Sequence, residues 1–245
     1  MKLLIDADFT VYKCCAASET EIDFGDDVVL VTSKFTEAYA CVMREIKRIE
    51  NHFGAFDDTI LFFSSPDNFR KKILPDYKGH RNRKKPCAYK RVINKLKTEF
   101  EVITMPTLEA DDAMGIYATK NPGNIIVSPD KDMKQIPGML YNLEDSFTIT
   151  KEEGAKWHLV QSAAGDNTDG YAGIPGIGIK RATKLFEDNG WSWKTLVNAF
   201  VDKGLTEKDA LTNARLAKIL TTDDYDHEKG EPVLWSPKAD YCINS

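Results

Sequence analysis

The sequence lacks the paired cysteines that build disulfide frameworks and zinc sites. Both kinds of site use cysteines at short, regular spacing, most often as CxxC pairs. No CxxC pair occurs in the 245 residues, and the cysteines are odd in number: Cys14, Cys15, Cys41, Cys87 and Cys242. We therefore expect reduced thiols in a cytosolic protein, with neither disulfides nor structural zinc.

Long hydrophobic runs are also missing. A helix that spans a bilayer needs about 20 consecutive apolar residues, and no run approaches that length. The apolar stretch from Leu3 to Ile5 is interrupted by Asp6, so we expect neither an export signal nor a membrane partner. No internal repeat or low-complexity tract is present, and the length suits one large domain or one and a half.

The chain has no excess of positive charge. It carries 33 Lys and Arg against 38 Asp and Glu, a formal net charge of −5, while 42% of its residues are hydrophobic. The hydrophobic content is that of a globular protein. Taken alone, the acidic balance argues against a nucleic-acid partner, because phosphate backbones attract positive charge.

Short apolar runs alternate with helical stretches in the first 150 residues. Apolar residues at helical spacing predict an amphipathic helix over residues 34–53. Such alternation is typical of an α/β fold in which helices flank a mainly parallel, twisted sheet. Strands are expected at residues 2–6, 58–64, 101–105, 124–128 and 139–143.

The strand signals stop after about residue 151. We therefore expect an α/β core over residues 1–150 and a helical lobe over residues 151–245. No element is predicted within residues 221–245. Helices are expected in the lobe near residues 153–164, 179–188, 192–202 and 207–220.

Acidic residues follow four of the predicted strands closely. In an open parallel sheet the carboxyl ends of the strands lie along one edge, so acids far apart in sequence can converge there. Converging carboxylates raise one another's pKa unless cations neutralise them. Oxygen ligands without His or Cys suit Mg²⁺ or Mn²⁺. With the acids of "GDNTD", the candidate ligands are Asp6, Asp67, Glu109, Asp111, Asp112, Asp130, Asp132, Asp166 and Asp169.

Each acid also has a structural interpretation. The carboxylates of "LEADD" could cap a helix, "SPDKD" could be a solvated turn, and Asp67 could be an ordinary turn residue. Their combination at several strand ends favours a metal site. Setting the nine acids aside also makes the remaining charge positive, so the acidity is concentrated where metal ions would neutralise it.

The opening "DADFTV" has a rival interpretation. It fits the first motif of haloacid dehalogenase-type phosphatases, in which Asp6 would be the nucleophile and Asp8 the acid or base. Ser64 would then bind phosphate, Lys78 would neutralise the intermediate, and "GDNTD" would be the acidic fourth motif. However, a helical stretch precedes "GDNTD", whereas that family places its fourth motif after a strand.

Two further segments point to a phosphate backbone. "GIPGIGIKRA" runs glycines into a basic helix start, a pattern that resembles the helix-hairpin-helix of DNA-binding proteins. Residues 70–91 hold ten Lys or Arg against one acid and interleave tyrosines, which suits a single-stranded backbone and its bases. The candidate DNA contacts are Arg70, Tyr77, Arg83, Lys84, Lys85, Gly173, Gly176, Gly178, Lys180 and Arg181.

With these motifs together, the chain resembles a 5′-nuclease of the flap-endonuclease superfamily, most closely the 5′→3′ exonucleases of T-odd bacteriophages. The motifs occur in family order: "LLIDADF", "PDNFRKKILPDYKGHR", "LEADDAMG", "SPDKDM" and "GDNTDGYAGIPGIGIKRA". The resemblance implies a PIN-like core, a helical arch over about residues 70–100 and a helix-hairpin-helix (H3TH) over about 165–188. It gives Asp8 no family role, and we expect Asp8 to cap a helix.

The resemblance also implies a mechanism. Two Mg²⁺ ions, replaceable by Mn²⁺, would serve hydrolysis from the 5′ end of DNA, with Lys78 and Arg81 as catalytic arch residues and a K⁺ at the glycine hairpin. The substrate would be a duplex with a free 5′ end or 5′ flap, or an RNA-DNA hybrid, cut by a monomer of phage origin in the host cytoplasm. The alternatives are the phosphatase and a non-catalytic DNA-binding protein.

Overall fold

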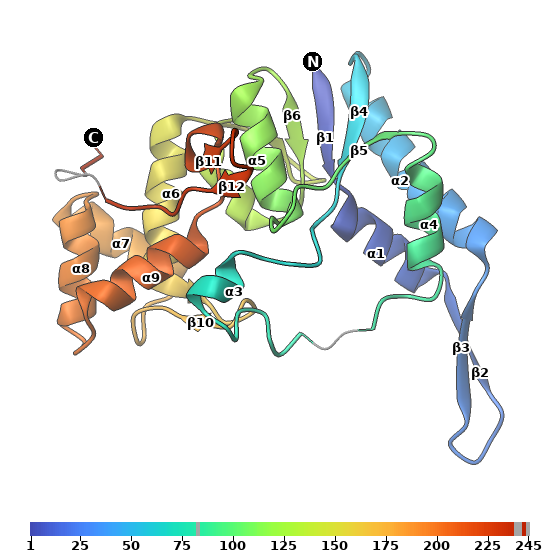
Figure 1. The fold of residues 1–245 in the computed structure, drawn as a ribbon, viewed down its shortest axis with the longest axis horizontal. Coiled ribbons are helices and arrows are strands. Elements are labelled where there is room, and N and C mark those ends of the chain that lie inside the picture. Colours follow the sequence, from blue (N-terminus) through green and yellow to red (C-terminus); the bar gives the residue numbers. More distant parts are fainter. Residues whose placement is uncertain (82–83, 238–241, 244–245) are drawn as a thin grey trace.

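The centre of the molecule is a six-stranded sheet. The computed structural model describes residues 1–81, 84–237 and 242–243, and the sheet has the order β5-β4-β1-β6-β7-β8 (Figure 1). All neighbouring strands are parallel except β7 and β8. The mainly parallel sheet and its five predicted strands are confirmed, and β8 is an addition. The strands are β1 (Lys2–Asp6), β4 (Asp58–Phe62), β5 (Glu101–Ile103), β6 (Ile125–Val127), β7 (Gly138–Tyr141) and β8 (Ser146–Ile149).

Helices cover both faces of the sheet. Leu3 and Ile5 of β1 pack on one face with α1 (Ala7–Ala17), α2 (Phe35–Phe53) and α4 (Tyr89–Leu96). Leu4 points to the other face, where α5 (Ala110–Lys120) packs. Because side chains alternate along a strand, the wholly apolar run of β1 is buried on both sides. This is the arrangement expected of a parallel sheet.

The lobe that follows is helical, as predicted. It contains α6 (Lys151–Ala164), α7 (Ile179–Asn189), α8 (Trp193–Val201) and α9 (Glu207–Ala217), which share a core that includes Phe186 and Phe200. Between α6 and α7 lie the short paired strands β9 (Gly165–Asp166) and β10 (Tyr171–Ala172). Within the described ranges, no helix combines the length and apolar character that a membrane crossing requires.

The chain after α9 returns to the α/β core. Ile219 packs in the apolar cluster on the α5 face of the sheet, and Leu220 packs with Ile116 of α5. The short helix η2 (Thr222–Asp224) and the paired strands β11 (Tyr225–Asp226) and β12 (Glu231–Pro232) follow. Residues 219–220 of the predicted lobe therefore pack on the α/β core.

A β-hairpin that was not predicted from the sequence projects from the core. It consists of β2 (Glu19–Asp23) and β3 (Val29–Ser33), and Figure 1 shows it extending away from the sheet. Its apolar side chains are exposed, with Phe24 at 66% and Val28 at 57%. Its acids are Glu19, Glu21, Asp23, Asp26 and Asp27, and no Lys or Arg lies between residues 14 and 33.

The basic segment, residues 70–91, is less helical than expected. A short α3 (Arg70–Ile73) begins it and α4 ends it, and the described residues between them, 74–81 and 84–88, contain no helix. The prediction of a helical arch is therefore wrong for these residues. Pro75, Gly79 and Pro86 oppose helix formation, and the neighbouring lysines repel one another.

Arg70 and Asp112 form a buried ion pair that joins three parts of the chain. The guanidinium of Arg70 donates to both carboxylate oxygens of Asp112, at 2.6 and 2.9 Å. It also donates to the carbonyl oxygens of Leu216 at 2.9 Å and Lys218 at 2.6 Å. Arg70 is 1% exposed and Asp112 0%, so Arg70 as a DNA contact and Asp112 as a direct metal ligand are wrong predictions. Each charge is already satisfied by the other. An outer-shell role of Asp112 stays a prediction.

We expect Arg70→Met to destabilise the protein by about 3 to 5 kcal/mol, because it leaves a buried carboxylate without its partner. The double variant Arg70→Met/Asp112→Leu should recover part of this loss, since it removes both charges. Urea unfolding monitored by circular dichroism measures both values. A single variant as stable as the wild type would contradict the role of the pair.

Candidate active site

Carboxylates from both parts of the molecule surround one cavity of about 480 Å³. It lies at the carboxyl ends of β1 and β6, where the strand order of the sheet reverses and ligands bind in open α/β folds. A second cavity of about 570 Å³ has one carboxylate, Asp223, in its lining, so the smaller cavity is the candidate site. The carboxylates that line it are Asp6, Glu109, Asp111, Asp130, Asp132, Asp166 and Asp169.

Local structure fixes the acids at the sheet edge. Asp6 ends β1 and caps α1, because its carboxylate accepts from the N–H of Phe9 at 3.2 Å. Its other oxygen accepts from the hydroxyl of Ser128, at 3.0 Å, just after β6. Asp130 caps the short helix η1 (Lys131–Gln135) by accepting from the N–H of Asp132 at 2.9 Å. The strand ends thus hold Asp6, Asp130 and Asp132 in defined directions.

The remaining acids come from a helix start and a loop. Glu109 and Asp111 lie at the N-terminus of α5. Asp166 follows α6, and its carboxylate accepts from the N–H of Thr168 at 2.7 Å. The N–H of Asp169 donates to the carbonyl oxygen of Asp166 at 3.1 Å. This tight turn brings both acids of "GDNTD" to the same cavity.

Burial makes several of these carboxylates hard to ionise. It raises the pKa of Asp6 to about 6, with a smaller contribution from the charge of Asp8. The pKa of Asp132 rises to about 7 through burial and the charge of Asp130. The pKa of Asp111 lies well above its ordinary value for the same two kinds of reason. The cavity therefore favours positive charge.

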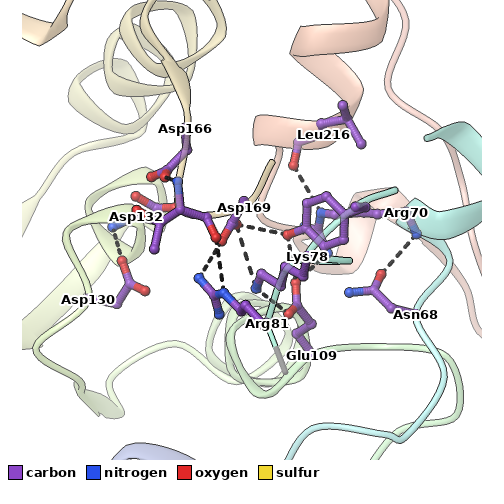
Figure 2. A network of polar contacts seen from close by, with 12 residues as sticks. Asn68, Arg70, Lys78, Arg81, Glu109, Asp130, Asp132, Asp166, Asp169 and Leu216 are labelled. Carbon is purple, nitrogen blue, oxygen red and sulfur yellow. Dashed lines mark hydrogen bonds and ion pairs between the residues drawn. The ribbon is translucent and has the colours of Figure 1, made fainter. Parts of the chain in front are cut away.

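Besides Arg70, three cations of the chain supply part of that charge, and Figure 2 shows two of them, Lys78 and Arg81. Lys78 forms ion pairs with Glu109 and Asp169. Arg81 donates to Asp169 at 2.7 Å. Burial would raise the pKa of Glu109, but Lys78 and Arg70 outweigh it and lower that pKa to about 2.

Lys131 is the third cation, and its ammonium lies 3.1 Å from the carboxylate of Asp166. Burial opposes the charge of Asp166, but the hydrogen bond from Lys131 lowers the pKa of that carboxyl below its ordinary value. Lys131 is not among the site residues predicted from the sequence. Its place between the two acids of "SPDKD" was the signal that could have found it.

The basic segment is anchored to the loop after α6. The N–H of Lys78 donates to the carbonyl oxygen of Asp169 at 2.8 Å, and Arg81 donates to that of Thr168 at 3.0 Å. The hydroxyl of Tyr77 lies 3.0 Å from Glu109 and 2.9 Å from Asp169. Tyr77 is 2% exposed, so its prediction as a DNA contact is wrong. Its ring packs in the interior of the protein.

Asp67 and Asp8 have other positions than expected. Asp67 is exposed and does not line the cavity, because β4 ends at Phe62 and the intervening loop pairs with residues 107–108. Its assignment as a cavity ligand is therefore wrong. Asp8 does not cap α1, because its carboxylate accepts from the N–H of Ser64 at 2.8 Å and the hydroxyl of Tyr89 at 2.9 Å.

The donor set suits divalent cations by its chemistry. It consists of carboxylate oxygens, the ligands that hard cations prefer, and their mutual repulsion is relieved by added positive charge. As the side chains stand in residues 1–81, 84–237 and 242–243, however, no three acidic, His or Cys groups could hold one ion. Glu109, Asp166 and Asp169 instead face Lys78, Lys131 and Arg81.

Several predicted DNA contacts of the glycine hairpin and of the basic segment lie on the surface. Gly176, Gly178, Lys180 and Arg181 are exposed, as are Lys84 and Lys85. Gly176 has φ +78° and accepts from Arg181 at 2.7 Å through its carbonyl oxygen. Their DNA contacts remain predictions, and Arg83 lies outside the described residues.

Gly173 has a structural role of its own. A Cβ at this position would lie 2.2 Å from the carbonyl carbon of Ala164 and 2.4 Å from the carbonyl oxygen of Ala163. Only glycine allows the loop to approach the end of α6 so closely. Packing therefore accounts for Gly173 without a ligand.

The sequence is similar to those of known proteins. The family model of the 5′–3′ exonuclease N-terminal resolvase-like domain matches residues 1–158. The chain belongs to the 5′–3′ exonuclease family. It is 28% identical to the exodeoxyribonuclease of Enterobacteria phage T3 over 97% of this chain and 93% of that protein. The exonuclease of Escherichia phage T7 is also 28% identical, over 96% and 93% of the two chains.

Solved structures show the same fold as this 5′–3′ exonuclease. The phage T5 D15 protein, crystallised with metal ions, superposes with a TM-score of 0.68 at 15% identity, over 89% of each chain. The catalytic core of Rad2 in complex with DNA gives 0.57 at 16% identity, over 83% of this chain and 66% of the Rad2 chain. The predicted mixed fold is confirmed.

The phosphatase interpretation does not suit this exonuclease. "GDNTD" follows α6 and belongs to the β9–β10 hairpin, outside the central sheet. Asp8, which that mechanism needs as an acid or base, is held by Ser64 and Tyr89. The motif at residues 6–11 therefore resembles the phosphatase signature in sequence alone.

The raised pKa of Asp132 predicts a pH-dependent stability in metal-free exonuclease. Its folded value of about 7 exceeds the ordinary 3.8, so ionisation penalises the folded state increasingly from about pH 4 and fully above pH 7. We expect Asp132→Asn to raise the melting temperature by about 2 to 5 °C at pH 8, and by less at pH 4.5.

Differential scanning calorimetry in EDTA measures this difference. Glu144→Gln, which changes an exposed acid, is the matched control and should show no such dependence on pH. If Asp132→Asn raised the melting temperature equally at both pH values, the charge of Asp132 would not be the cause of the stabilisation.

Proposed function

We propose that this 5′-nuclease uses two Mg²⁺ ions, replaceable by Mn²⁺, to hydrolyse DNA from a free 5′ end or at a 5′ flap. The observation that carries the proposal is the meeting of seven carboxylates from four separate segments around one cavity, with Lys78 and Arg81 at its side. A DNA-binding protein without activity needs no such group of acids.

Two sets of acids would hold the ions. In such sites the metals activate a water molecule and stabilise the leaving oxygen. Asp6, Glu109 and Asp111 form the set nearest the start of α5. The second set contains Asp130, Asp132, Asp166 and Asp169.

Lys78 and Arg81 present positive charge to a phosphate that approaches the acids. Both side chains enter the cavity from the basic segment, and both now pair with carboxylates. Their partners Glu109 and Asp169 hold them within the cavity, ready to donate to phosphate oxygens in the transition state. A short movement of either flexible side chain would exchange its carboxylate partner for a phosphate.

The exposed cations would bind the duplex away from the cut. Lys84, Lys85, Lys180 and Arg181 are candidates, and the free N–H groups at the start of α7 would add to them. We further propose a K⁺ at the hairpin carbonyls, action as a monomer in the host cytoplasm, and cleavage of RNA-DNA hybrids. The family relationship and the phage relatives motivate these four proposals.

Cleavage of a duplex with a short 5′ flap tests the function. The substrate is labelled at the 5′ end or, separately, at the 3′ end, and is incubated with and without Mg²⁺. We expect Mg²⁺-dependent products from the 5′ side, and no products from Asp132→Asn. Intact DNA in the presence of Mg²⁺ would refute the proposal, while product lengths separate exonuclease from flap cutting.

Lys78→Ala should lower kcat by about 100-fold or more, because it removes charge from the transition state. Duplex affinity should change little. Lys90→Ala, which changes an exposed lysine on α4, is the matched control. Single-turnover rates and fluorescence anisotropy measure the two effects, and an unchanged rate would remove Lys78 from the mechanism.

A further inference from the structure

Two buried glutamines connect the carboxylate cavity to the backbone that follows α9. Gln135 ends η1 and is 4% exposed, while Gln161 lies on α6 and is 3% exposed. A buried amide that lacks hydrogen-bond partners is costly. The partners of these two side chains therefore define how each is held.

The backbone determines which end of each amide faces which neighbour. The N–H of Ile219 can only donate, so the atom of Gln135 that lies 3.0 Å from it is Oε1. Its Nε2 then lies 2.6 Å from the carbonyl oxygen of Ala217 and 2.6 Å from Oε1 of Gln161. The remaining Nε2 of Gln161 donates to Oδ1 of Asp132. Hydrogen bonds are thus donated in one direction, from the N–H of Ile219 through Gln135 and Gln161 to Asp132.

We propose that Gln161 is a positioning residue for Asp132 in metal binding, oriented in turn by Gln135. It holds one carboxylate oxygen of Asp132 and leaves the other for a divalent cation. The inference rests on the proposed two-metal function. It extends that function to an uncharged residue that does not line the cavity.

The same contacts align the two halves of the second set of acids. Asp130 caps η1 of the α/β core and Asp132 lies within η1, whereas Asp166 and Asp169 follow α6. The bond from Gln161 on α6 crosses between them. It fixes the direction of Asp132 relative to the loop that carries the other acids.

Direct Mn²⁺ binding tests the proposal without using activity. The free ion is counted from its electron paramagnetic resonance signal, with wild type, Gln161→Met and Ser162→Ala compared. Met keeps the length of the side chain but cannot donate. We expect Gln161→Met to weaken the binding of one Mn²⁺ ion by about 10- to 100-fold. Replacing other residues that orient a metal ligand has an effect of this size.

Ser162→Ala is a matched control on the same helix. Ser162 is 0% exposed, and its hydroxyl donates to the carbonyl oxygen of His158 at 2.7 Å. The variant loses one buried hydrogen bond, whereas Gln161→Met loses the two that its amide makes with Gln135 and Asp132. The hydroxyl of Ser162 does not contact an acid of the cavity. Its Mn²⁺ affinity should equal that of the wild type. Equal weakening in both variants would show a merely structural role and overturn the proposal.

A double-mutant cycle with Asp132→Asn separates action through Asp132 from a general effect. Gln161→Met should alter the remaining Mn²⁺ affinity by less than about twofold when Asp132 is already replaced. An undiminished effect in that background would refute the proposal, as would wild-type affinity in Gln161→Met. Gln161→Asn, whose amide is withdrawn by one methylene, should also weaken Mn²⁺ binding. If Gln161→Met does not fold, Gln161→Asn tests the proposal in its place.

Failure of the proposed function would be recognised separately. If the wild type neither bound Mn²⁺ nor cut the flap substrate, the metal mechanism and this inference would both be refuted. If the wild type did both and Gln161→Met bound Mn²⁺ equally well, only the role of Gln161 would be lost.

Discussion

The buried pair of Arg70 and Asp112 sets the relation between the basic segment and the two halves of the molecule. Arg70 begins the segment, Asp112 lies in the first turn of α5, and the guanidinium also binds backbone carbonyls at the end of α9. A bidentate pair allows little freedom of angle. The start of the segment is therefore fixed, and Tyr77 and Lys78 enter the cavity from a defined point.

In the candidate site, repulsion between acidic side chains is partly balanced by basic side chains. Parallel strand ends and one loop bring together more acids than the cavity can ionise without cost. Lys78, Arg81 and Lys131 offset part of the repulsion. The basic groups that would bind a phosphate therefore also stabilise the folded protein when no ligand is bound. Catalysis and stability thus depend on the same charges.

Features with a local signal were predictable from the sequence. The apolar run of β1 ends on Asp6, and parallel strands place their carboxyl ends at a common edge, so the meeting of Asp6 with Asp130 and Asp132 could be inferred. The length of the loop after β4 could not, because it depends on pairing with residues 107–108. Asp67 was for this reason placed in the cavity incorrectly.

Other features depended on partners that no sequence pattern reveals. Arg70 and Asp112 look like any surface Arg and Asp until the fold buries them together. Tyr77 resembled a base-stacking residue because its neighbours are basic. Gln161 carries no charge and lies within a helix, so nothing in its surroundings distinguished it. The β2–β3 hairpin lacks the alternation of apolar and polar residues that marks a half-buried strand, because neither of its faces is buried.

That hairpin has a consequence for the behaviour of the protein in concentrated solution. Both of its edges are unpaired in the described structure, and exposed valines lie beside them, a combination that promotes edge-to-edge association. Its acids, unopposed by any nearby base in sequence, repel a second hairpin. Salt screens such repulsion beyond about 8 Å at 0.15 M and leaves the apolar attraction intact. Colloidal stability should thus be greatest at low ionic strength and above the pKa range of carboxylates.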